Sequence, residues 1–246
     1  MKKLLAALIL VLLIAGGGFW SLYSGFGLDE AKDAARQVMT SQKKQTLADL
    51  EKRAKAGEKA AQLKLAKVYT EGELTSQDYQ KAATWYYQAA KQGDPQAQYE
   101  IARMYEQGRG LKQDNFRAAE WYRLAAGPGR NADAQFKLGQ MYSSGRGVPN
   151  DYDEAIRLFG LSANQGHPGA QFLLGAMNEE GWGRRRDLVK AYKWYTLALE
   201  REAEVRAINT QYDPFASRAG IEAKMNRAQI EEALAAAAAW KKARGK

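Results

Sequence analysis

Cysteine is absent from this 246-residue chain, and histidine occurs only once, at His167. No disulfide, thiolate nucleophile or cysteine-ligated metal is therefore possible. A zinc site needs several converging ligands, and a Ser-His-Asp triad would have to use this same histidine, so the sequence predicts no metal, cofactor or catalytic residue. Proline is also scarce, with 5 residues, and alanine is abundant, which favours helix. The 13 tyrosines and 6 tryptophans exclude a disordered chain.

Concentrated positive charge is missing from the middle of the chain. The net charge is +9, yet residues 58–202 contain 20 basic and 18 acidic side chains, so most of the excess lies near the two ends. Binding of nucleic acid requires a stripe of positive charge along the folded body. We therefore expect no nucleic-acid partner.

The longest uncharged stretch runs from Leu4 to Leu28. As a helix it would span about 37 Å, which is enough to cross a bilayer with some tilt. Lys2 and Lys3 precede it and are expected to stay in the cytoplasm. This pattern favours an uncleaved inner-membrane anchor with the body in the periplasm. The alternative is a signal peptide with its apolar region at 4–15, whose cleavage would leave a soluble periplasmic or secreted protein.

A period of 36 to 37 residues organises the rest of the chain. Each of four copies opens with an Ala-Gln pair, which begins at Ala61, Ala97, Ala134 and Ala170. A glycine follows in each copy, at Gly72, Gly108, Gly145 and Gly181. An aspartate comes six residues after that glycine, at Asp78, Asp114, Asp151 and Asp187. A pair of large residues completes the copy: Trp85-Tyr86, Trp121-Tyr122, Leu158-Phe159 and Trp194-Tyr195.

Each position of this period has a physical interpretation. Ala61, Leu65 and Tyr69 are spaced four apart and share one helix face. The glycine ends this first helix in the left-handed conformation, and the aspartate caps the second helix. The large pairs form the inner face of the second helix. His167 stands where Asp94 stands two copies earlier, each before a proline, so we interpret it as a helix cap.

This pattern resembles the Sel1-like repeat, a relative of the tetratricopeptide repeat. The best copy is Ala134 to Tyr142, followed by Gly145-Arg146-Gly147-Val148, and the resemblance covers about residues 47–202. It implies an all-α, right-handed α-solenoid of helix-pair repeats, here preceded by an N-terminal hydrophobic helix. It also implies a non-enzymatic adaptor that binds protein partners.

The segments before and after the repeats are expected to cap the solenoid. Leu47 to Gly57 is interpreted as the second helix of an incomplete unit, and Glu222 to Lys242 as one long closing helix. Ile208 to Gly220 is predicted to be a loop with a turn at Asp213-Pro214. The predicted organisation is an anchor or signal segment at 1–28, a linker or helical lead-in at 29–46, the solenoid at 47–202 with repeats near 61–96, 97–133, 134–169 and 170–202, and capping helices with a basic tail at 203–246.

Two features that resemble catalytic or phosphate sites have simpler explanations. Glu179-Glu180 and Glu231-Glu232 are neighbours in sequence, and neighbours on a helix point in different directions, so they form no acid/base pair by themselves. Gly108-Arg109-Gly110 and Gly145-Arg146-Gly147 lack the Lys-Ser/Thr that follows in a phosphate-binding loop, and they recur as inter-helix turns.

The candidate partner-binding residues fall into two groups. The first group lies three and six residues after the repeat alanines, on the concave first-helix face: Lys64, Lys67, Glu100, Arg103, Lys137 and Gln140. The second is Trp182 with the basic run Arg184, Arg185 and Arg186, which is either a contact patch or a loop tryptophan folded onto its own repeat beside solvated arginines. Trp240 with Lys241 and Lys242 is likewise either a partner or lipid contact or a solvated helix end.

The sequence therefore predicts a membrane-anchored scaffold that faces the periplasm and supports assembly or regulation of an envelope complex. Its partner is expected to be a protein. The alternative is an exported carbohydrate- or peptidoglycan-binding or hydrolytic accessory protein, which would need a pocket with converging polar groups.

Overall fold

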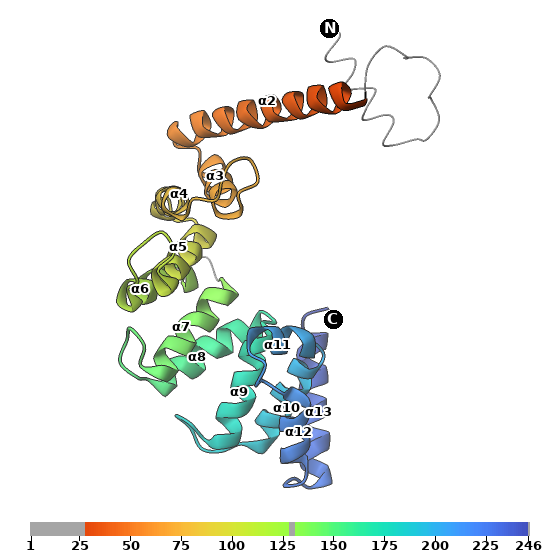
Figure 1. The fold of residues 1–246 in the computed structure, drawn as a ribbon. Coiled ribbons are helices and arrows are strands. Elements are labelled where there is room, and N and C mark those ends of the chain that lie inside the picture. Colours follow the sequence, from red (N-terminus) through yellow and green to blue (C-terminus); the bar gives the residue numbers. More distant parts are fainter. Residues whose placement is uncertain (1–27, 128–130, 246) are drawn as a thin grey trace. The chain divides into compact units, whose positions relative to one another are not determined.

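The computed structural model describes residues 28–127 and 131–245, and twelve helices and no strand occur in these ranges (Figure 1). The all-α prediction is thus confirmed for this part of the chain. The helices are α2 (Leu28–Lys55), α3 (Lys59–Glu71), α4 (Tyr79–Lys91), α5 (Pro95–Gln107), α6 (Asn115–Ala126), α7 (Ala132–Ser144), α8 (Tyr152–Asn164), α9 (Pro168–Glu180), α10 (Leu188–Leu199), α11 (Glu202–Ile208), α12 (Pro214–Glu222) and α13 (Arg227–Lys242). The chain divides into two compact units within α4, after Trp85.

The helix ends lie where the repeat predicts them. Gly108 and Gly145 close α5 and α7 with φ of 69° and 70°, a left-handed conformation that residues with a Cβ rarely adopt. Asp114 and Asp151 cap α6 and α8, because each carboxylate accepts a hydrogen bond from the backbone N–H three residues later. Local sequence therefore sets the length of each helix before any packing is considered.

The first unit contains α2, α3 and the start of α4. A single helix, α2, runs through both the predicted lead-in and the predicted capping helix. Its last turns bury Leu50 and Ala54 beneath α3. The Tyr69 hydroxyl donates to Glu51 Oε1 at 2.9 Å, so α3 is joined to α2 by a polar contact as well as by apolar packing.

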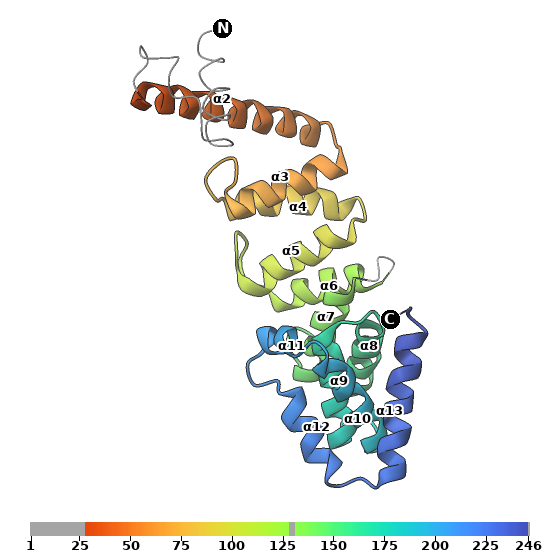
Figure 2. The ribbon, with the colours of Figure 1, turned by 90° about the vertical axis from the view of Figure 1, so that its right-hand side faces the viewer.

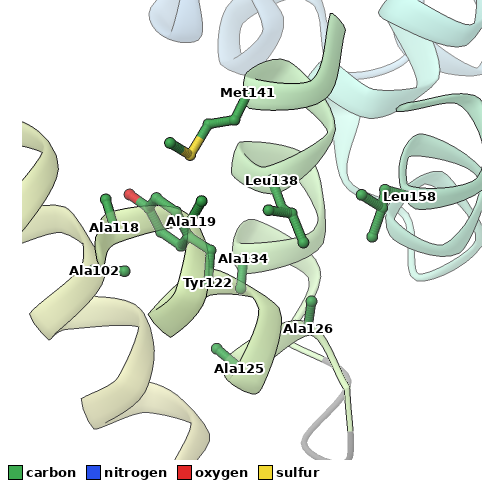
Figure 3. Packing of buried hydrophobic residues seen from close by; sticks show 10 residues of the cluster. All are labelled: Ala102, Ala118, Ala119, Tyr122, Ala125, Ala126, Ala134, Leu138, Met141 and Leu158. Carbon is green, nitrogen blue, oxygen red and sulfur yellow. The ribbon is translucent and has the colours of Figure 1, made fainter. Parts of the chain in front are cut away.

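In the second unit, the helices of a pair approach closely where a small residue faces a buried aromatic ring. A Cβ added to Gly139 of α7 would lie 2.7 Å from Cε1 of Phe159 in α8. One added to Gly175 of α9 would lie 2.6 Å from Tyr195 in α10. In the α5–α6 pair, alanines line the corresponding contact instead of glycine. Figure 3 shows Tyr122 of α6 among alanines of α5 and α6, with α7 beside it. Small residues thus make room for one ring in each pair.

The Trp-Tyr pairs are core residues in only one of their two positions. Tyr122, Phe159 and Tyr195 are almost fully buried, whereas Trp121 and Trp194 are half-buried. The prediction that both members lie in the core holds for Leu158-Phe159 but only in part for the tryptophans: Trp121 packs against the core cluster and stays half-exposed. Successive residues of a helix point about 100° apart, so the two members of a pair face different neighbours.

Neighbouring repeats of the second unit are joined by buried hydrogen bonds. The carboxamide of Gln98 donates to the carbonyl of Ala90, and that of Gln135 donates to the carbonyl of Ala126, at 3.2 and 3.1 Å. Each bond satisfies a carbonyl near the C-terminal end of the preceding second helix, which has no partner within its own helix. Gln98 and Gln135 of the Ala-Gln pairs therefore have an inter-repeat role that composition alone does not reveal.

The C-terminal end of the second unit is closed by three helices. α11 packs on α9, while α12 and α13 pack on α10, as both views show (Figure 2). The predicted loop at Ile208 to Gly220 is wrong from Pro214 onward, because Asp213 caps α12 by accepting a bond from Ala216 N. An Asp-Pro pair fits a helix start as well as a turn. The predicted closing helix from Glu222 to Lys242 is one helix, α13, but it begins only at Arg227, where Asn226 forms a capping box, and Glu222 is the last residue of α12.

Within the described residues no helix is both long enough and apolar enough to span a bilayer. Residues 4–27 of the predicted hydrophobic helix lie outside those residues.

The close contact at Gly139 gives a first prediction. We expect Gly139→Ala to lower the free energy of unfolding by about 1–3 kcal/mol, because the buried Phe159 ring must shift to admit a methyl group. Gly160→Ala, in α8, is the matched control, since no described atom lies within 4 Å of the point that its Cβ would occupy and the helix gains propensity. That control should raise the free energy of unfolding by roughly 0.5–1 kcal/mol. Urea titrations of the two variants measure both changes in the free energy of unfolding. A Gly139→Ala protein that is at least as stable as the wild type would contradict the close-contact explanation.

Candidate partner-binding surfaces

The first-helix face of the second unit is polar and partly exposed. Glu100 and Arg103 lie on α5, and Lys137 and Gln140 lie at the equivalent positions of α7. Arg103 donates to Glu100 at 3.0 Å, so these two charges largely neutralise each other. Lys137 forms no ion pair within residues 86–127 and 131–245. The structure therefore places four of the predicted residues on neighbouring first helices, with Lys137 as a free cation.

A tyrosine and an aspartate add to this face. Tyr99 lies beneath the Arg103 guanidinium, 5.7 Å from it, and burial raises the pKa of Tyr99 to about 12, so its phenol stays protonated. A hydrogen bond from His167 holds the pKa of Asp133 below its usual value, and the charges of Arg103 and Lys137 act in the same direction. Asp133 therefore favours the folded state above its ordinary pKa, and this contribution is lost as pH falls through the lowered pKa.

The polar face ends at the fourth repeat. Leu173 and Ala176 of α9 stand at the positions that carry Lys137 and Gln140 in α7, and both pack against the C-terminal cluster. Tyr212, which follows α11, stacks on Phe172 with ring centroids 4.7 Å apart. In the last repeat the first-helix face is thus apolar and covered by the chain itself.

The remaining two residues of this group, Lys64 and Lys67, lie in the first unit. Both are exposed on α3, and Lys67 Nζ is 3.6 Å from a carboxylate oxygen of Glu71. Of these two predicted residues, only Lys67 forms an ion pair within the described part of the first unit.

Trp182 lies in the turn between α9 and α10, and 49% of it is exposed. Its ring is 6.0 Å from that of Tyr152 at the start of α8, so it contacts the preceding repeat rather than only its own. Arg184, Arg185 and Arg186 are all exposed, and none forms an ion pair in the part of the chain that the structure describes. The predicted patch is therefore an accessible aromatic ring beside three free cations.

The equivalent turn of the third repeat has a different role. Arg146 donates to Glu106 Oε1 at 2.5 Å, and the buried Tyr122 hydroxyl donates to the other carboxylate oxygen at 2.7 Å. At the end of the stack, the Tyr195 hydroxyl and Lys224 contact Glu179 in the same way, at 3.0 and 3.7 Å. These carboxylate contacts were not predicted from the sequence, although Glu106 and Glu179 stand at the same repeat position.

Lys224 thus supplies from the C-terminal cap the cation that Arg146 supplies from the next repeat.

His167 is a structural residue, as predicted. Its Nδ1 accepts from Ala170 N at 3.1 Å, and Nε2 lies 3.3 Å from Asp133 Oδ1. Its ring stacks on Phe136 with centroids 4.3 Å apart. No group of three or more His, Cys, Asp or Glu residues that could hold a metal gathers anywhere in the described ranges.

Comparison with protein families finds one matching family model, described as Sel1 repeat, over residues 59–94, 95–127, 132–167 and 168–202. These matches cover more than half of the chain. A solved Sel1 repeat protein from Oxalobacter formigenes is 27% identical, with a TM-score of 0.58 over 66% of this chain and 72% of its own. The c5321 protective antigen of uropathogenic Escherichia coli, which displays an SLR fold, is 24% identical with a TM-score of 0.63. That match covers 96% of this chain and 53% of the antigen, so this chain spans about half the antigen's length. No curated protein matches the chain in sequence.

The role of His167 as a cap can be tested with two substitutions. Both His167→Ala and His167→Asn remove the stacking on Phe136, but only asparagine, the residue that caps α7 at Asn131, can still accept the bond from Ala170 N. We expect the asparagine variant to be more stable than the alanine variant by about 0.5–2 kcal/mol in chemical denaturation. Equal stability of the two variants would show that the cap contributes nothing.

Proposed function

The chain belongs to the Sel1 repeat family, and on that basis we propose that it is a scaffold that holds a protein partner on its first-helix face at the cell envelope. Sel1 repeat proteins generally mediate protein–protein interactions, and the repeat is generally a non-enzymatic scaffold. Stacked helix pairs offer extended surfaces rather than deep pockets, which suits recognition of another protein.

The observation that carries this proposal is the contrast between repeats on the first-helix face. In the second and third repeats the face bears accessible polar groups around Arg103 and Lys137, whereas the chain's own C-terminal helices cover the apolar face of the fourth. A surface that is left open in some repeats and covered in the last is suited to receive a partner. Because Lys137 has no ion-pair partner among the described residues of its unit, an acidic group of the partner is the favoured contact.

Trp182 and the three arginines after it form a second contact in this proposal. Tryptophan and arginine are the residues most enriched where single side chains dominate binding energy. The ring of Trp182 is half exposed, whereas the equivalent position of the turn in the third repeat carries the polar residue Arg146.

Photo-crosslinking in cells tests the first-helix face. A photoreactive amino acid at Lys137 should give discrete adducts with one partner, and one at Glu231, on the exposed side of α13, should give none. A triple arginine-to-alanine variant of residues 184–186 with Trp182→Ala should keep the fold and weaken that adduct. Adducts from Glu231 alone would refute binding at the first-helix face, and an undiminished adduct in the quadruple variant would remove the second contact.

We also propose that residues 4–28 anchor the protein in the inner membrane, with Lys2 and Lys3 in the cytoplasm and the repeats in the periplasm. The support is the uncharged stretch and the position of the two lysines before it. This location is what places the scaffold within reach of envelope complexes.

Fusion reporters test this topology. Alkaline phosphatase joined after Lys246 should be active, because it folds only outside the cytoplasm, and a fusion lacking residues 1–28 should be inactive. Washing of membranes with carbonate distinguishes the anchor from a cleaved signal, since only an anchored chain stays in the pellet. An inactive full-length fusion contradicts the proposed orientation.

A further inference from the structure

The second-helix side of the second unit carries a stripe of apolar side chains that is distinct from the first-helix face. We call it the second-helix stripe; it consists of Tyr87, Trp121, Leu124, Leu161, Trp194 and Trp240. The rings of Tyr87 and Trp121 are 5.7 Å apart, and those of Trp194 and Trp240 are 6.3 Å apart, both nearly perpendicular. The stripe thus has an aromatic pair at each end.

Two exposed leucines lie between these aromatic pairs. Leu124 is 51% exposed and Leu161 is 40% exposed. Leu124 lies one turn beyond Trp121, and Leu161 lies one turn beyond Leu158, which belongs to the cluster that Trp121 packs against. Asn164, a further turn along α8, accepts a hydrogen bond from the Trp240 indole at 3.3 Å. Leu124 and Leu161 stand at the same position of successive repeats, between the two aromatic pairs, so the exposed apolar side chains follow one row of the repeat rather than lying scattered.

The fourth repeat shows what such a surface can receive. Leu197 stands at the repeat position of Leu124 and Leu161, yet it is only 2% exposed. Its helix, α10, is the second helix on which α13 packs, and α13 places Trp240 against Trp194 one turn before Leu197. An alanine-rich helix of the chain itself thus covers the position that the two preceding repeats leave open.

Three cations lie over aromatic rings of the stripe, while the acidic side chains Glu120 and Glu200 lie near Trp121 and Trp240. Lys91 lies 5.7 Å from the centroid of Tyr87, Lys193 lies 4.4 Å from that of Trp194, and Arg244 lies 4.2 Å from that of Trp240. Each is held by a ring, and none forms an ion pair among residues 86–127 and 131–245.

Burial of Lys193, with the nearby charges of Arg244 and Lys190, lowers the pKa of that lysine. A carboxylate placed between Lys193 and Arg244 would remove this repulsion, so an anionic group is the complement of this end of the stripe.

We propose that the second-helix stripe binds an acidic amphipathic helix of a protein partner. Small apolar residues of that helix, three or four apart, pack on Leu124 and Leu161, and its carboxylates pair with Lys193 and Arg244. A second copy of α13 is the wrong occupant, because its last turn carries lysines that would meet these cations. The second-helix stripe shares no residue with the first-helix face, so the proposal for one surface can be wrong while the proposal for the other holds.

A synthetic peptide tests the proposal in solution. The probe is a fluorescein-labelled, 16-residue peptide with the apolar spacing of α13 and glutamate at all other positions; the matched peptide has lysine there. Fluorescence anisotropy is measured with the full chain in detergent. We expect the glutamate peptide to bind and the lysine peptide not to bind.

Variants then locate the peptide. Leu124→Ser with Leu161→Ser should weaken binding at least roughly tenfold, because two buried leucine contacts are lost. Lys193→Gln with Arg244→Gln should weaken it roughly two- to fivefold, and more at low salt. Leu234→Ser is the matched control, a similarly exposed leucine of α13 that is not part of the stripe, and should change nothing.

Three results overturn the proposal: no binding of the glutamate peptide, equal binding by the double leucine variant, or equal loss with Leu234→Ser. Vesicles of phosphatidylcholine and phosphatidylglycerol in equal parts are titrated in parallel. If they bind in a stripe-dependent way and the peptide does not, the stripe is a lipid contact and the helix proposal is wrong.

Discussion

The close approach of two helices, made possible by a small residue opposite a buried ring, is the contact on which the second unit depends. At Gly139 and Gly175 there is no space for even one methyl group, because Phe159 and Tyr195 fill it. Interiors are packed as densely as organic crystals, so this distance is set within a few tenths of an ångström. It fixes how the two helices of a pair lie, and thereby which side chains each pair presents to the next.

The contacts between pairs follow from that geometry. Gln135 reaches the carbonyl of Ala126 only because α7 lies close to the end of α6. The carboxylate of Glu106 is shared by Tyr122 of its own repeat and Arg146 of the next, so one buried acid fixes both the pair and the junction. At the end of the stack, Lys224 of the C-terminal segment takes the place of the arginine and pairs with Glu179. The carboxylate that joins two repeats at Glu106 therefore joins the last repeat to its cap at Glu179.

Two surfaces of opposite character result from this stacking. First helices present charged and polar groups such as Lys137, and second helices present the apolar row that includes Leu124 and Leu161. The C-terminal helices cover both surfaces in the last repeat only, which leaves them open in the two before it.

The sequence by itself determined the helix pairs, since left-handed glycines, aspartate caps and the alanine spacing act within a few residues of the chain. It also identified the family and placed Trp182 in an exposed turn. Only the tertiary structure decided that Tyr122 is buried while Trp121 is half-exposed, that Glu106 is clamped, and that Asp213 begins a helix. It alone revealed the second-helix stripe, because Leu124 and Leu197 occupy the same repeat position and differ only in what packs over them. Local signals specify where a helix begins and ends, but exposure depends on neighbours distant in sequence, and no short-range pattern records them.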